Sequence, residues 1–173
     1  MTVHDPLAPH SHEPNPHPPS PDADLTVHLP DGTAHRITPA ALRSLDFVPD
    51  GRLPERPAGP RQVTIPNCYI VSTGHGTSGP FSFTGLRLLD LVELLWPADW
   101  THVEVVSADG FGTRALRTEL TQPTQRPVIL AHTLDRQPLS RAEGLVRLIV
   151  PSETDDALRQ VKWVAQVRII SDK

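Results

Sequence analysis

The chain of 173 residues contains a single cysteine, Cys68, at the end of a strand-like segment just before a glycine-rich stretch, residues 72–79. A lone thiol cannot pair within its own chain, so Cys68 is either a small apolar core residue or a reactive group. A thiolate is a soft metal ligand, and a glycine-rich loop presents backbone N–H groups that can bind a phosphate. Together they could hold a soft metal whose organic ligand carries a phosphate, whereas position alone favours simple core packing of Cys68.

The segments that must position this cysteine are short, and strands outnumber helices. Residues 24–37 alternate apolar and polar side chains on either side of a turn at Gly32, which is typical of a β-hairpin. Thr38 can cap a helix whose first residue is Pro39, and this helix is expected to continue through residue 45. Residues 46–62 are rich in proline and arginine and are expected to form a long surface loop.

A second helix and several strands are expected after Cys68. Apolar residues recur at i, i+3, i+4 and i+7 within residues 86–95, which predicts a helix with one buried face that Pro97 ends. Pro66 has no N–H, so it places part of the preceding strand at a sheet edge or in a bulge. The sequence therefore predicts one mixed α+β domain of short strands with two or three short helices. Its strands are expected at residues 63–71, 102–107, 111–117, 127–132, 145–150 and 163–170.

Composition excludes several classes of function and separates a tail from the domain. The formal net charge of −4 gives no footprint for nucleic acid, and no apolar run reaches the length of about 20 residues that crosses a membrane. The first residues lack the features of a secretory signal, so a cytoplasmic protein is expected. Residues 1–23 are rich in proline and histidine and are expected to be a disordered tail. Zinc or copper handling by these histidines is a weaker alternative, because their spacing matches no tight metal site.

The order of these features resembles the molybdopterin-binding catalytic domain of the sulfite oxidase family. The resemblance covers roughly residues 24–171 and depends on the order and spacing of short motifs. A domain over residues 24–173 is therefore expected behind the tail. The motifs are the cysteine after a strand, Thr84-Gly85 before the leucine-rich helix, Asp109-Gly110-Phe111, the segment from Ala131 to Pro138-Leu139, the segment from Gly144 to Arg147 and Pro151, and Lys162-Trp163.

The resemblance implies a cofactor and a role for Cys68. In that family a cysteine thiolate and the dithiolene sulfurs of a pyranopterin hold molybdenum, and oxo groups complete the site. Cys68 would therefore ligate molybdenum–molybdopterin, and the protein would be an oxidoreductase that carries out two-electron oxo transfer on a small substrate. The stretch 72–79 would line the cofactor, and an arginine or lysine would bind a phosphate tail or an anionic substrate. The candidate cofactor-binding residues are Thr73, Gly74, His75, Gly76, Thr77, Ser78, Arg114 and Lys162.

Structural roles remain open for several of these residues. The stretch 72–79 is alternatively a hydrophilic connector, in which His75 is a solvated loop residue. Arg147 and Lys162 are alternatively ordinary surface charges. Arg114 and Arg117 would point to opposite faces of one regular strand, so they cannot both line one pocket without a bulge. Asp109 is expected to fix a turn.

Two functions follow, because the sequence departs from the family pattern in places. The upstream arginine–histidine motif is missing, and the residues after Cys68 and at 143–146 differ from the usual ones. The haem and dimerisation domains of the family are also missing, so any electron acceptor is expected to be a separate molecule. The chain is then either a molybdenum-dependent oxidoreductase or a metal-free member that acts as a binding or regulatory module. The first function predicts that Cys68 faces a cleft lined by residues 72–79 and an arginine, and the second predicts Cys68 in apolar packing.

Overall fold

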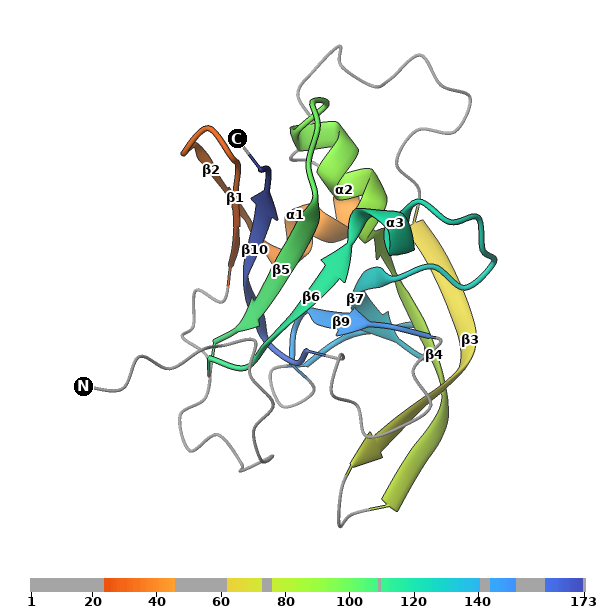
Figure 1. The fold of residues 1–173 in the computed structure, drawn as a ribbon. Coiled ribbons are helices and arrows are strands. Elements are labelled where there is room, and N and C mark those ends of the chain that lie inside the picture. Colours follow the sequence, from red (N-terminus) through yellow and green to blue (C-terminus); the bar gives the residue numbers. More distant parts are fainter. Residues whose placement is uncertain are drawn as a thin grey trace, which may run out of the picture.

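The computed structural model describes residues 24–45, 62–72, 76–108, 110–140, 144–151 and 161–172. This part of the chain is rich in strands and has three short helices, which is the α+β class that the sequence predicts (Figure 1). Several expectations lie outside the described residues: the tail at 1–23, nearly all of the loop at 46–62, the turn at Asp109, and the candidates Thr73, Gly74 and His75.

One sheet contains five strands in the order β2-β1-β10-β5-β6. The hairpin predicted at the start of the domain is present as β1 (Leu25–His28) and β2 (Ala34–Ile37). β1 pairs in parallel with β10 (Val164–Ile170). β10 in turn pairs with β5 (His102–Ser107), and β5 pairs with β6 (Gly112–Leu116), both antiparallel. The first and last described strands of the chain therefore lie side by side.

The second sheet carries the cysteine. Its order is β3-β4-β7-β8, and β9 also pairs with β7. β3 (Gln62–Ser72) and β4 (Gly76–Arg87) form a long antiparallel hairpin, and one end of it extends beyond the neighbouring strands in Figure 1. The shorter strands are β7 (Ile129–Leu134), β8 (Gln137–Pro138) and β9 (Arg147–Ile149).

The prediction of a glycine-rich loop at residues 72–79 is wrong over most of the part that the structure describes. Gly76, Thr77 and Ser78 belong to β4 and pair with Ser72, Val71 and Ile70 of β3, in that order. The pairing extends the hairpin by several residues on each strand. A run of small and polar residues predicts a loop only weakly, because an antiparallel ladder takes its hydrogen bonds from the backbone.

The helices begin and end at recognisable signals. Thr38 Oγ1 accepts a hydrogen bond of 2.9 Å from Ala41 N at the start of α1 (Pro39–Ser44), as predicted. α2 (Leu88–Leu95) is the expected leucine-rich helix and ends before Pro97. α3 (Arg117–Leu120) was not expected, because residues 111–117 read as one strand; Arg117 in fact starts this helix.

Two hydrophobic clusters fill the interior. The larger one joins the inner face of the first sheet to α1, α2 and part of the second sheet, and Leu25, Leu91 and Val167 are fully buried in it. The smaller one lies on the second sheet and includes Cys68 and Phe83. Each fully buried aliphatic side chain contributes about 1.5–3 kcal/mol to the free energy of unfolding.

A chain of side-chain hydrogen bonds ties α1 to the second sheet. Gln62 Nε2 donates to the carbonyls of Leu42 and Arg43 at 3.0 and 3.2 Å, so its Oε1 is the atom that accepts from His132 Nε2 at 2.7 Å. His132 Nδ1 then accepts from the Thr133 hydroxyl, also at 2.7 Å. Burial, and secondarily Arg43, lower the pKa of His132 to about 4. Since the lowered pKa keeps the ring neutral near pH 7, its single proton is on Nε2.

No helix among the described residues is both long enough and apolar enough to span a membrane.

Candidate functional site

Cys68 lies where the regular pairing of β3 is interrupted. β3 is an edge strand, and its register with β4 shifts between Ile65 and Cys68 and again between Cys68 and Ile70. Pro66 has no N–H for the ladder, and Asn67 has a positive φ of 56°. The prediction that Pro66 marks an edge or a bulge is therefore confirmed, and we call residues 66–68 the β3 bulge.

The thiol of Cys68 is enclosed. The residue is only 4% exposed and packs in the smaller cluster, and its Sγ donates to the Ile65 carbonyl at 3.4 Å. Burial raises the pKa of the thiol, and the nearby Arg126 guanidinium opposes this rise. The other members of the cluster are Ile65, Phe83, Ile129, Ala131, Leu139 and Ile149, with Val63, Phe81 and Leu134 at its margin.

Arg126 is the charged side chain that contacts the β3 bulge. It comes from the α3–β7 connection, and its Nη1 donates to the Pro66 carbonyl at 2.7 Å. Its Nη2 donates to the Asn67 carbonyl at 3.2 Å and lies 3.9 Å from Cys68 Sγ. One guanidinium therefore binds all three residues of the bulge. Sequence reasoning missed it, because no motif marks an arginine that is 58 residues from its partner cysteine.

A second guanidinium lies on the same cluster. The Arg147 side chain of β9 stacks over the Phe83 ring, 5.9 Å from its centroid. Phe83 packs in the cluster that contains Cys68. Two guanidinium groups, those of Arg126 and Arg147, therefore lie beside a cluster that contains one thiol. Two cations beside this cluster favour an anionic ligand over a neutral one, and Arg126 partly offsets the rise that burial causes in the pKa of the Cys68 thiol.

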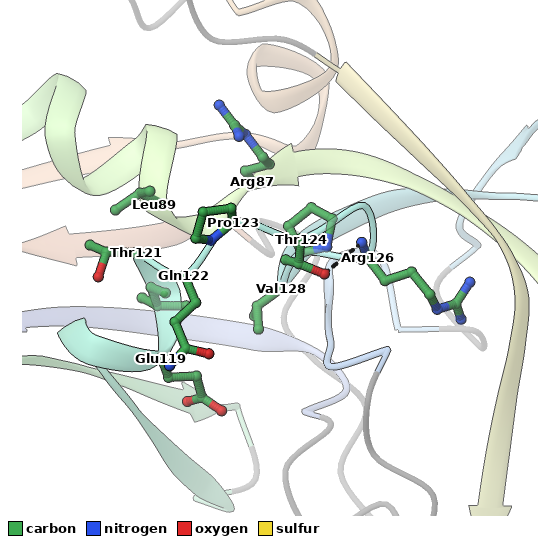
Figure 2. A pocket seen from close by; sticks show the side chains of 11 residues that line it. Arg87, Leu89, Glu119, Thr121, Gln122, Pro123, Thr124, Arg126 and Val128 are labelled. Atoms are coloured by element: carbon green, nitrogen blue, oxygen red, sulfur yellow. Dashed lines mark hydrogen bonds between the residues drawn. The ribbon is translucent and has the colours of Figure 1, made fainter.

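A cavity of about 440 Å³ lies between the start of α2 and the α3–β7 connection. Figure 2 shows the Arg126 guanidinium pointing away from the other lining residues, whereas Glu119 and Gln122 lie together on the opposite side. Cys68 is not among the residues that line it. The cavity is lined by Arg87, Leu89, Glu119, Leu120, Thr121, Gln122, Pro123, Thr124, Arg126, Pro127 and Val128.

The other predicted site residues that the structure describes have contacts, but none of these contacts is with the Cys68 thiol. Arg114 is exposed on β6, the edge of the first sheet, with its Nη2 3.6 Å from Glu104 Oε2. Lys162 lies over the ring of the next residue, Trp163, with Nζ 4.7 Å from the centroid. The structure describes the backbone of Gly76 to Ser78 in β4, on the hairpin that contains Cys68.

The described residues contain no cluster of three or more histidine, cysteine, aspartate or glutamate side chains that could hold a metal ion. A zinc or copper site of the common all-protein type is therefore absent from this part of the chain. The molybdenum centre that the sequence resemblance implies would make a different demand, because there the organic cofactor would supply most of the ligands and the chain a single sulfur.

Comparison with known protein families assigns the part of the chain that contains Cys68, Arg126 and Arg147 to a class of domain. A family model for the oxidoreductase molybdopterin-binding domain matches residues 58–173, well over half of the chain. The chain therefore belongs to this family of oxidoreductase domains that bind a molybdenum cofactor. The match begins before β3 and includes the β3 bulge, Arg126 and Arg147. No curated protein matches the chain.

Proposed function

We propose that this chain is a sulfite-oxidase-type domain that binds molybdenum–molybdopterin, with Cys68 as the metal ligand. It carries out two-electron oxo transfer on a small substrate and passes the electrons to a separate acceptor, without nucleic acid or membrane as a partner. The observation that carries the proposal is the contact between the chain's single thiol and the Arg126 guanidinium, 3.9 Å from Sγ to Nη2. A cytoplasmic location is part of the proposal, since a lone thiol stays reduced there.

The donor chemistry at the β3 bulge fits such a cofactor. A soft thiolate suits a metal that is already bound by the sulfurs of an organic ligand. The guanidinium of Arg126 offsets the negative charge that Cys68 acquires when it loses its proton. Arg147, over the Phe83 ring, adds positive potential on the same cluster, which suits a cofactor that carries a phosphate. When bound, the cofactor supplies a centre that cycles through two electrons.

A metal-free binding or regulatory module is the second candidate, and the enclosure of the thiol favours it. Cys68 is 4% exposed, packs among apolar side chains and is absent from the wall of the 440 Å³ cavity. Sequence reasoning assigned such packing to this second function. Under the first function, the same observation means that the sulfur must be uncovered before it can bind the metal.

Metal analysis of three proteins separates the two functions. The wild type, Cys68→Ser and Arg36→Gln are purified from a host that makes the cofactor, and molybdenum is measured per chain. We expect about one molybdenum per chain in the wild type and loss of most of it in Cys68→Ser, because a hydroxyl is a poor ligand for a soft site. Arg36 is exposed and paired with Asp24 on the first sheet, so its substitution controls for the loss of a guanidinium.

The result decides between the candidates in either direction. Wild-type protein that stays free of molybdenum in a competent host would establish the metal-free module. Equal molybdenum in wild type and Cys68→Ser would show that the cofactor binds without this thiol, which contradicts the proposed ligand.

A further inference from the structure

We propose that Arg126 is a positioning residue that holds Pro66 and Asn67 of the β3 bulge in place beside Cys68 and so controls access to the thiol. The functional importance of this restraint rests on the proposed function, because a thiol that binds a metal must be accessible to it. The restraint itself is a property of the chain without cofactor.

The regular register between β3 and β4 is interrupted at the β3 bulge. Pro66 and Asn67 are not paired with β4, whereas Ile65 pairs with Phe83 and Cys68 with Phe81. β3 is also the edge of its sheet, so no strand of the described part lies on its other side. Pro66 and Asn67 therefore lie outside the regular register with β4, and such an interruption at a sheet edge favours local opening.

Arg126 donates to both residues at this interruption. Its Nη1 and Nη2 donate to the carbonyls of Pro66 and Asn67 at 2.7 and 3.2 Å. The planar guanidinium presents its N–H groups in a fixed fork, so one side chain can bind two adjacent carbonyls. Hydrogen bonds from a charged donor are stronger than those between neutral groups. Loss of both should therefore raise the population of the open bulge by a large factor.

The backbone of Arg126 is also held in place. Arg126 N–H donates to Thr124 Oγ1 at 3.0 Å, and Pro127 follows directly. The stem of Arg126 lines the cavity together with Thr124, while the guanidinium points away toward β3 (Figure 2). The α3–β7 connection thus aims the guanidinium at the bulge, 58 residues earlier in the chain.

The test measures how fast a neutral reagent, iodoacetamide, alkylates Cys68 in the metal-free native protein at fixed pH. We expect Arg126→Gln to react at least about 10-fold faster than wild type, because the bulge opens more often. Arg126→Lys should lie between the two, since an ammonium keeps one donor but not the fork. Thr124→Val, which releases only the anchor of the stem, should accelerate the reaction less than Arg126→Gln. Arg36→Gln is the control and should react like wild type.

A purely electrostatic role for Arg126 gives the opposite sign. The guanidinium lowers the pKa of the Cys68 thiol, so its removal alone would leave less thiolate and slow the alkylation. A slower or unchanged reaction in Arg126→Gln would overturn the positioning role.

The urea dependence of the alkylation rate distinguishes local opening of the bulge from global destabilisation of the protein. Local opening gives a rate that is nearly independent of urea below the unfolding transition, whereas global unfolding gives a rate that rises steeply with it. A steep rise in both Arg126→Gln and Arg126→Lys would likewise overturn the role. Because no cofactor is present, this test can fail while the molybdenum proposal stands, and it can succeed while that proposal fails.

Discussion

The free energy of unfolding is expected to fall by about 3 kcal/mol between pH 6.5 and pH 4 through His132 alone. Its pKa is about 4 in the folded protein and 6.5 when unperturbed, because burial and the Arg43 charge disfavour the protonated ring. Between these values the unfolded chain binds the extra proton, so stability is complete above pH 6.5 and is lost as the pH falls toward 4. Urea unfolding at a series of pH values measures this loss.

His132→Gln isolates the contribution of this ring. The glutamine amide can still donate to Gln62 Oε1, but it does not titrate. The free energy of unfolding of the variant should therefore fall by about 3 kcal/mol less than that of the wild type over the same pH range. His28→Gln, on β1 of the other sheet, controls for the removal of a histidine and should keep the wild-type dependence. Identical pH profiles for His132→Gln and wild type would contradict the lowered pKa of His132.

Gly85→Ala is expected to lower the free energy of unfolding by about 3 kcal/mol or more, near or beyond the upper end for overpacked sites. A Cβ at Gly85 would lie 2.0 Å from the Leu130 carbonyl oxygen and 2.6 Å from Ala131 Cα. Both obstacles are backbone atoms of β7, which pairs with β4 at this point, so neither can move aside without breaking the sheet. The corresponding shift in Tm is about 10 °C for a chain of this size.

Gly32→Ala is the matched control for this substitution. A Cβ there meets nothing within 4 Å, and the positive φ of 90° is the sole source of strain. The expected cost is about 1 kcal/mol, the difference between left- and right-handed backbone for a residue with a Cβ. Equal melting temperatures for Gly85→Ala and Gly32→Ala would mean that β4 and β7 are not packed as closely as the structure shows.

Local signals predicted the parts of the fold that depend on a few neighbouring residues. The cap at Thr38, the proline that ends α2 and the alternation in β5 each depend on physics within a single turn or strand. The same local reasoning was wrong at Gly76–Ser78, which pair with β3, and at Arg117, which starts α3. The structure of Gly76–Ser78 depends on pairing with β3, and that of Arg117 depends on where β6 ends. Neither can be read from the composition of the segment.

The candidate site divides in the same way. Cys68 was found because it is the only thiol, and Pro66 correctly predicted the irregular strand beside it. Arg126 was missed because its contacts with the β3 bulge span 58 to 60 residues. Long-range side-chain contacts of this kind depend on the register of two elements and leave no periodic trace in the sequence.

X-ray absorption at the molybdenum edge tests most directly whether Cys68 supplies a ligand to the metal. The measurement compares the sulfur coordination of molybdenum in purified wild-type protein with that in Cys68→Ser protein that has been loaded with cofactor. We expect the wild type to show one more sulfur neighbour than the variant, because the thiolate adds to the sulfurs of the organic ligand. The same sulfur count in both proteins would contradict the account.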